Sequence, residues 1–297
     1  MEKYEVSYVD LDTGETIAYR KAGNGSKTYV LIHGNISSSV WFEELMEELA
    51  KGDRTIYALD IPGCGDSTYN RPLESLHDIS RDVSAFILKF DLRDIFLLGW
   101  STGGGIAMET AADLPERVKK LILLSSVGIT GYPIYKRTIF TPLSTELIRT
   151  RKDMYEFNAM VRPMLSMFSK HNKYLMRGMM EQGIYTKKIP RDEYIDKYVD
   201  GALKQRNYVD ILTAIVNFNM TDKRVRGIDG SGRANLIKAP IYIIHGDRDV
   251  IVDDSFAEET AEYFGTQGEF KMFRGCGHSI VTDDFEGLIK YIIRIEN

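Results

Sequence analysis

The sequence predicts an α/β fold in which a mostly parallel, eight-stranded sheet carries helices on both faces. Three observations predict it: β-rich runs alternate with helical patterns in the first part of the chain, this alternation stops near Gly128, and it resumes at Ile241. Strands that alternate with helices form parallel sheets, because each helix returns the chain to the same edge. The 297 residues, 43% of them hydrophobic, suffice for a large core.

The first part of the chain supplies six of the expected strands. Two β-rich runs, at 4–9 and 16–21, form a first pair. The strands that follow are continuous apolar runs, as strands buried on both faces should be, and they are expected at 29–33, 55–59, 95–99 and 121–125. Between them, apolar residues recur on one face of helical patterns at 40–50, 75–90 and 103–113.

Residues 132–234 show a different pattern, with helical periodicity, few strand signals and many Met, Tyr and Phe residues. We expect this stretch to form a helical cap over a core domain made of residues 1–131 and 235–297, with the Gly-rich segment 227–232 as the return linker. The cap methionines are expected to pack a compact core, and the alternative is that some line an apolar substrate pocket. The last two strands and the closing helix are expected at 241–245, at 269–273 and from about Phe285.

A candidate nucleophile lies at the end of the strand 95–99. The segment Gly99-Trp100-Ser101-Thr102-Gly103 matches the pattern G-x-S-x-G, in which a serine occupies a tight strand-to-helix turn and projects its hydroxyl at the sheet edge. An apolar strand precedes this segment, and a helix rich in small residues follows it. The alternative is a serine that only caps a helix. The context favours Ser101 as a nucleophile.

A serine hydroxyl needs a base, and three histidines follow Ser101 in the chain. His171 lies in the expected cap, and His245 ends a strand, where packing is the expected role. His278 lies in the turn Gly275–Ser279 after the last strand, and such a loop brings an imidazole over the sheet edge. His278 is therefore the predicted base.

The acid that orients the histidine should follow the penultimate strand. Asp249 is the predicted residue, because a carboxylate beyond the turn points back along the sheet edge towards the His278 loop. Asp247 is the alternative, although it is expected to brace the turn by accepting backbone hydrogen bonds. Asp253 is a third candidate.

The developing oxyanion needs two N–H donors. One is expected from the backbone of Thr102, the residue after the nucleophile, and the other from the loop His33-Gly34-Asn35, where Asn35 is the predicted residue. The side chain of Asn35 is a possible additional donor, and the alternative is that only its backbone contributes. His33 is expected to be structural.

These motifs resemble those of the α/β-hydrolase superfamily over residues 17–293. The resemblance implies the α/β-hydrolase fold, with an eight-stranded mostly parallel sheet, a helical cap insertion and a Ser101–Asp249–His278 triad. The segment 60–67 resembles the turn after the fourth strand of that fold, which is usually structural. The motifs that carry the resemblance are His33-Gly34-Asn35, Gly99–Gly103, and Gly246–Asp249 followed by Gly277-His278.

Two subfamilies resemble the chain more locally. Asn35 with Trp100 beside the nucleophile is similar to haloalkane dehalogenases, but those use Asp as the nucleophile, and Ser101 argues against that chemistry. The second subfamily is the intracellular poly(3-hydroxybutyrate) depolymerases of bacilli, whose corresponding segment often has Met where this chain has Thr102. The resemblance to these depolymerases rests on the segments 99–105, 126–135, 205–207 and 230–232.

We therefore expect a serine hydrolase that cleaves a carboxylic ester, such as a hydroxyalkanoate or another apolar acyl ester, by acyl transfer. The alternatives are hydrolysis of a lactone, an amide or a carbon–carbon bond, or a ligand receptor without turnover. No residues have metal-ligand spacing and no phosphate loop is present, so no metal and no cofactor is expected. The partner is expected to be a small-molecule ester, and no feature indicates an oligomeric state.

The remaining features bear on other partners and on location. A net charge of −5 gives no electrostatic reason for binding nucleic acid or an anionic membrane. No apolar run approaches the roughly 20 residues that span a bilayer, and the first residues do not resemble a secretory signal. Cys64 and Cys276 are expected to be free thiols, and the expected location is cytoplasmic.

Overall fold

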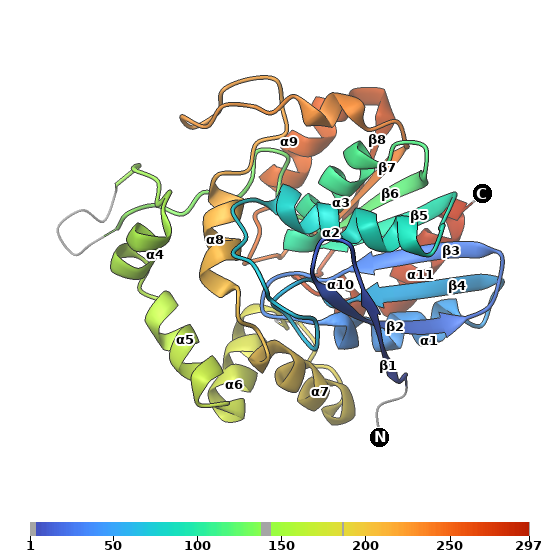
Figure 1. Cartoon of the computed structure of the whole chain (residues 1–297), viewed down its shortest axis with the longest axis horizontal. Coiled ribbons are helices and arrows are strands. Elements are labelled where there is room, and N and C mark those ends of the chain that lie inside the picture. The colour runs from blue at the N-terminus through green and yellow to red at the C-terminus, as the bar shows by residue number, and fades with distance from the viewer. Residues whose placement is uncertain (1–3, 138–143, 186, 297) are drawn as a thin grey trace.

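The computed structural model describes residues 4–137, 144–185 and 187–296. Within these residues, eight strands form one sheet in the order β1-β2-β4-β3-β5-β6-β7-β8 (Figure 1). β2 is antiparallel to both of its neighbours, and all other pairs are parallel. This confirms the predicted α/β-hydrolase fold. The strands are β1 (Val6–Asp10), β2 (Thr16–Gly23), β3 (Lys27–Ile32), β4 (Arg54–Leu59), β5 (Ile95–Trp100), β6 (Val118–Leu124), β7 (Ile241–Gly246) and β8 (Gly268–Phe273).

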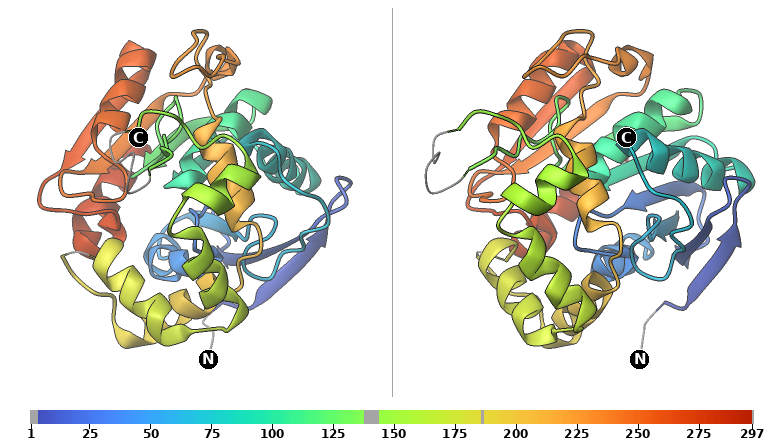
Figure 2. Two further views of the ribbon diagram at one scale, coloured as in Figure 1. Left: turned by 90° about the vertical axis from the view of Figure 1, so that its left-hand side faces the viewer. Right: turned by 60° about the vertical axis from the view of Figure 1, so that its left-hand side comes forward.

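Helices cover both faces of the sheet (Figures 1 and 2). α2 and α3 pack against each other on one face, and α1 and α11 pack together on the other. These core helices and short 3-10 turns are η1 (Ser39–Phe42), α1 (Glu43–Leu49), α2 (Leu76–Lys89), α3 (Thr102–Asp113), η2 (Arg233–Leu236), α9 (Ser255–Phe264), η3 (Gly265–Gln267), α10 (Ile280–Asp283) and α11 (Phe285–Glu296).

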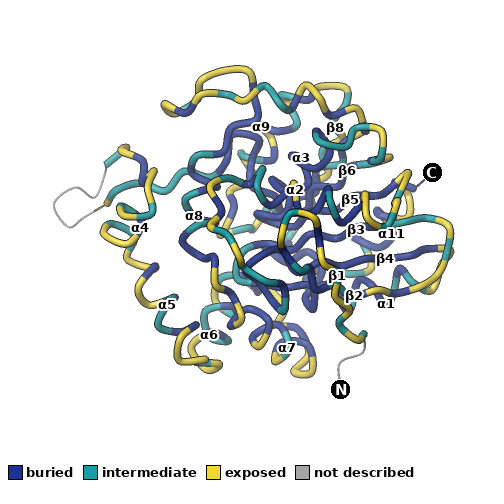
Figure 3. Tube along the Cα trace, in the orientation of Figure 1, coloured by how far each residue is buried: buried dark blue, intermediate teal, exposed yellow. Residues whose placement is uncertain are grey.

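The core lies around the central strands, which are buried along their length (Figure 3). Every residue of β4 and β5 is buried, whereas the edge strand β1 has no buried residue. Strands covered on both faces bury side chains on both sides, which explains why β5 and β4 after Thr55 have continuous apolar sequences. Tyr29 of β3 and Phe96 of β5 stack with ring centroids 4.8 Å apart, which fixes two neighbouring strands side by side.

Between β6 and β7, the described residues form helices and no further strand of the sheet, and α4–α8 lie beyond the carboxyl ends of β3 and β4 (Figure 1). Of the eight methionines that this part of the sequence contributes, six are buried, Met179 is partly buried and Met160 is exposed. The segment thus has an apolar interior of its own. Its helices are α4 (Arg151–Phe157), α5 (Val161–Ser169), α6 (Lys173–Gly183), α7 (Asp192–Leu203) and α8 (Tyr208–Val216).

An ionic cluster fastens the end of α11 to the sheet. Glu296, with a 1% exposed side chain, accepts hydrogen bonds from Lys27 Nζ (2.7 Å), Tyr29 Oη (2.6 Å) and Arg54 Nη2 (3.0 Å). Burial alone would raise the pKa of Glu296, but the hydrogen bonds from Arg54, Lys27 and Tyr29 outweigh burial and lower this pKa to about 2.

We expect Glu296→Gln to lower the free energy of unfolding at pH 7 by about 3 kcal/mol, because it leaves the largely buried Arg54 without its anion. The folded-state pKa lies below the unfolded value, so the stabilisation is present above about pH 4.5 and is lost as the pH falls towards 2. Urea unfolding at pH 7 and pH 3 measures both effects. The exposed Glu286 of the same helix gives the control Glu286→Gln, and an equal loss in the two variants would contradict the assignment.

Candidate active site

Ser101 occupies a strained turn between β5 and α3. Its φ is 56° and its ψ is −125°, a backbone conformation that residues other than glycine rarely adopt. The backbone around it is held on three sides: the Ser101 amide donates to the carbonyl of Leu124 (3.0 Å), and the Ser101 carbonyl accepts from the amides of Gly104 (3.0 Å) and Val127 (3.1 Å). The strain is therefore supported by the neighbouring strand and its loop.

Glycines allow the backbone to pass close to this turn. A β-carbon on Gly103 would overlap the carbonyl oxygen of Ile32, and one on Gly34 would lie 2.7 Å from Cβ of Ser101. Both positions therefore exclude any side chain. Gly34 belongs to the loop after β3, so the same close approach brings that loop, with Asn35, beside the serine.

Asp249 and His278 form a buried pair at the same edge of the sheet. His278 Nδ1 lies 2.7 Å from Asp249 Oδ2, and both side chains are almost completely buried. Trp100, the neighbour of Ser101, donates from Nε1 to the His278 carbonyl (3.1 Å), and the Trp100 and His278 ring centroids are 5.3 Å apart. Since Asp249 holds Nδ1, Nε2 is the nitrogen of His278 that remains for chemistry.

In the described parts of the chain, no hydrogen bond joins Ser101 Oγ to His278. In substrate-free enzymes such a contact is often long and tightens only when substrate is bound. The structure therefore brings the three predicted residues to one edge and pairs two of them directly.

The surroundings of Asp249 keep it ionised. Burial alone would raise its pKa, but attraction to His278 and hydrogen bonds from His245, His278 and the Val252 amide hold the pKa well below its usual range. His245 Nε2 lies 3.3 Å from Asp249 Oδ2, so two histidines flank this carboxylate. The amides of Ile251 (2.8 Å) and Val252 (3.0 Å) donate to Oδ1.

The other candidate residues lie elsewhere. Asp247 accepts a hydrogen bond from the Gly275 amide (2.5 Å) and so braces the turn before His278. Asp253 accepts from the Ser255 amide (3.1 Å) at the start of α9, and His171 is exposed between α5 and α6. His33 is fully buried, with Nδ1 2.7 Å from the Gly34 carbonyl oxygen and Nε2 accepting from the Ile61 amide (3.2 Å).

Two backbone amides face no acceptor near the serine. Thr102 is the first residue of α3, and Asn35 lies between β3 and η1. In the three described ranges, no protein group accepts a hydrogen bond from either amide. The Thr102 amide carries partial positive charge because it lies at the start of α3. Both free amides can donate to a developing negative charge.

Comparison with known proteins places the chain in a family. The family model described as Serine aminopeptidase, S33, matches residues 24–284. The chain belongs to this family of α/β-hydrolases. A similar curated protein is the 2-hydroxy-6-oxononadienedioate/2-hydroxy-6-oxononatrienedioate hydrolase of Paraburkholderia phymatum, 28% identical over 91% of this chain and 88% of the relative. Its counterpart named hydrolase 1 in Pseudomonas putida is 26% identical over 93% and 91%.

Solved structures share the fold. An esterase from Exiguobacterium antarcticum superposes with a TM-score of 0.73 at 20% identity and covers 98% of this chain and 99% of its own. A bromoperoxidase from Bacillus anthracis also has a TM-score of 0.73, at 17% identity, with 99% and 100% coverage. At these identities the likeness concerns the fold of the hydrolase alone.

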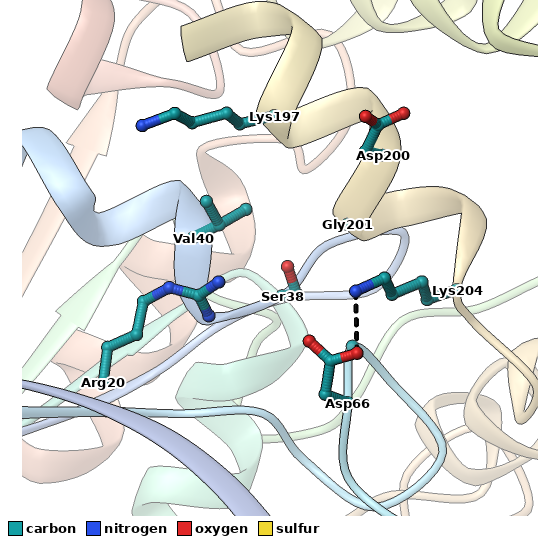
Figure 4. Close-up of a pocket in the computed structure, with 9 residues that line it drawn as sticks. Arg20, Ser38, Val40, Asp66, Lys197, Asp200, Gly201 and Lys204 are labelled. Carbon is teal, nitrogen blue, oxygen red and sulfur yellow. Dashed lines mark hydrogen bonds and ion pairs between the residues drawn. The ribbon is translucent and has the colours of Figure 1, made fainter. Parts of the chain in front are cut away.

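A polar cavity of about 220 Å³ lies between α7 and the loop that follows Asn35 (Figure 4). Its cations have anionic partners: Lys204 pairs with Asp66 (2.7 Å), and Arg20 and Lys197 contact Glu43. Neither Ser101 nor His278 lines it. This charged cavity is therefore distinct from the edge of the sheet that carries Ser101 and His278.

Other chemistry finds little support in the described ranges. No cluster of three or more His, Cys, Asp or Glu residues there is arranged to hold a metal ion. Cys64 and Cys276 are free and buried, and burial raises the pKa of both thiols, which makes them poor nucleophiles. No helix in this part of the hydrolase has both the length and the apolar character that crossing a bilayer requires.

Sequence reasoning missed two residues of this region. It assigned His245 to packing, whereas His245 also contacts the carboxylate of Asp249. It did not connect Gln205, which follows α7, with the Asn35 loop 170 residues away. The spacing of His245 and Asp249, four residues apart across a turn, is a signal that could have revealed the first contact.

Proposed function

We propose that this hydrolase cleaves a carboxylic ester by acyl transfer, with Ser101 as nucleophile, His278 as base and Asp249 as its orienting acid. The observation that carries the proposal is the strained Ser101 turn with the buried Asp249–His278 pair fastened beside it through Trp100. A hydroxyl presented next to an oriented imidazole is the arrangement that nucleophilic catalysis needs.

In the proposed mechanism, Ser101 Oγ forms a bond to the ester carbonyl carbon while its proton passes to His278 Nε2. The amides of Asn35 and Thr102 donate to the oxyanion of the tetrahedral intermediate. The intermediate collapses as the C–O bond to the alcohol breaks, and His278 returns the proton to the leaving oxygen. His278 then takes a proton from water, which attacks the acyl carbon; as the C–O bond to Ser101 breaks, His278 returns this proton to Ser101 Oγ and the carboxylic acid is released. These steps require no cofactor.

The helical segment is proposed to act as a cap that selects the acyl group, with residues 132–234 as the cap and 1–131 and 235–297 as the core. In support, α4–α8 lie beyond the carboxyl ends of β3 and β4, and Asn207 contacts the Pro62 carbonyl in the loop after β4 (2.6 Å). The segment is rich in methionine, a side chain that adapts to apolar groups of irregular shape, such as the acyl groups of hydroxyalkanoate esters.

A panel of substrates tests the proposal. We expect p-nitrophenyl acetate, butyrate and octanoate to be hydrolysed with one preferred chain length, and alanine p-nitroanilide far more slowly. Clearing of a suspension of amorphous polyhydroxybutyrate tests whether a hydroxyalkanoate ester is the substrate. Absence of clearing at high enzyme concentration would exclude this polymer as a substrate. Failure to hydrolyse any ester faster than the Ser101→Ala variant would contradict ester cleavage and favour a receptor.

Carbon–carbon bond hydrolysis is a second candidate, because the curated relatives that cover about nine-tenths of the chain are named for hydrolysing 2-hydroxy-6-oxononadienedioate. Incubation with that compound, with products separated by chromatography, distinguishes the two functions. Ser101-dependent cleavage of the dienedioate at a higher kcat/KM than any ester would replace the ester proposal.

A further inference from the structure

A chain of hydrogen bonds connects the helical segment to the loop that carries Asn35. Gln205 lies two residues beyond the end of α7, and it is only 3% exposed. Its Oε1 accepts from the Ile36 amide (2.8 Å), and its Nε2 donates to Asn35 Oδ1 (2.6 Å) and to Asn207 Oδ1 (2.8 Å). One side chain thus holds both the backbone and the side chain of the loop after β3.

Main-chain groups fix the direction of this relay at both ends. The Ile36 amide can only donate, which turns Gln205 Oε1 towards it and Gln205 Nε2 towards the two asparagines. The Pro62 carbonyl can only accept, and Asn207 Nδ2 donates to it, which leaves Asn207 Oδ1 for Gln205. Asn35 must therefore present Oδ1 to Gln205, and its Nδ2 remains as a donor without a partner in the described ranges.

The loop needs such support because its backbone is strained. Ile36 has a φ of 54°, in the left-handed region that β-branched residues avoid. A residue stays in that conformation only when its surroundings hold it there. In addition to Gln205, α7 contacts the part of the loop that follows Ile36. Gly201 of α7 lies so close to Ser38 that a β-carbon at position 201 would overlap Ser38 Oγ (Figure 4).

We propose that Gln205 is a positioning residue that holds Asn35 as an oxyanion donor. The inference rests on the proposed function, in which the Asn35 amide stabilises the tetrahedral intermediate. By occupying the Ile36 amide and Asn35 Oδ1, Gln205 fixes the loop so that the backbone amide and Nδ2 of Asn35 are the donors left for the oxyanion. The helical segment thereby controls the catalytic loop as well as covering it.

Two variants separate this role from a general contribution to folding. Gln205→Met removes all three hydrogen bonds, whereas Gln205→Glu keeps an acceptor for Ile36 but cannot donate to Asn35. We expect both to lower kcat on p-nitrophenyl butyrate by about 10- to 100-fold, with KM changed less than about threefold, because the interaction strengthens in the transition state. Affinity for butylboronic acid, which forms a tetrahedral adduct with the serine, should fall by the same factor.

A double-mutant cycle and a neighbouring residue complete the test. If Gln205 acts through Asn35, the part of the Gln205→Met effect that passes through Asn35 Oδ1 should disappear in an Asn35→Ala background, while the part that passes through the Ile36 amide should remain, so the two effects should be less than additive. Arg206 is the matched control, because it lies in the same turn but donates to the carbonyls of Gly65 and Ser67. Arg206→Met should keep the wild-type kcat.

Each outcome decides a different question. Unchanged kcat and boronic acid affinity in folded Gln205 variants, or effects that add to that of Asn35→Ala, would overturn the inference while leaving Ser101-dependent hydrolysis intact. Loss of folding in both variants, measured by circular dichroism, would also overturn the inference, since Gln205 would then be structural. Absence of ester hydrolysis in the wild-type protein would instead defeat the proposed function.

Discussion

Ser101→Ala should abolish ester hydrolysis, with kcat reduced by about 10⁴- to 10⁶-fold. The reason is that the proposed acyl-enzyme cannot form without Oγ. Only the oxyanion donors and substrate binding would then contribute to the residual rate. The Ser101 side chain packs beside Gly34 without a hydrogen bond to His278, so the variant should keep its fold. Stopped-flow and steady-state assays with p-nitrophenyl butyrate measure the loss, and thermal unfolding verifies the structure.

A serine of equal exposure serves as the control. Ser84 in α2 is 8% exposed, as Ser101 is, and lies on a helix that carries none of the proposed catalytic residues. Ser84→Ala should hydrolyse esters at the wild-type rate. A Ser101→Ala protein that retains more than about one-hundredth of the wild-type kcat would show that another group is the nucleophile.

Asp249→Asn should lower kcat by about 10⁴-fold. The amide neither favours the His278 tautomer whose Nε2 is free to accept a proton nor stabilises the imidazolium that forms. KM should change little, since Asp249 is buried behind the histidine. Asp247→Asn is the matched comparison two residues away: Asp247 braces the Gly275 turn, and its loss should cost less than about tenfold. An equal or greater loss in Asp247→Asn would contradict the assignment of Asp249.

The same variant has a pH-dependent stability. The pKa of Asp249 is lower in the folded state than in the unfolded chain, so its ionisation stabilises the fold above about pH 4 and this stabilisation is lost as the pH falls further. Asp249→Asn lacks this contribution, and the stability difference between the two proteins should therefore shrink in acid. A constant difference between pH 7 and pH 3 would exclude the linkage.

The fold class could be predicted because its signals are local. Buried parallel strands are continuous apolar runs, as in the segment around Leu97, and such runs can be recognised without knowing their neighbours. Element boundaries were less accurate. β3 begins at Lys27 rather than Tyr29, because its first residues are polar and are held by pairing with β4. The helix expected at 40–50 begins as a 3-10 turn, since the sequence pattern does not distinguish the two.

The site divides in the same way. Ser101 could be proposed as the nucleophile because its tight turn requires glycines at nearby positions, and these can be recognised in the sequence. Its role stays a prediction until the variants are measured. The partners of Asp249 and the relay through Gln205 depend on residues that folding alone brings together. Gln205 meets Asn35 across 170 positions, and nothing in either local sequence indicates the contact. Hydrogen bonds between loops that are far apart in the sequence can be identified only once the chain is folded.

The stacked tryptophans give the protein an optical reporter. Trp41 and Trp100 are the chain's two tryptophans, both are buried, and their rings stack 3.7 Å apart at an interplanar angle of 5°. Trp100 adjoins Ser101 and lies against His278. Tryptophan fluorescence and the near-ultraviolet dichroism of the coupled indoles therefore arise beside Ser101, so that loosening of this edge can be followed in the unlabelled protein separately from the unfolding of its helices.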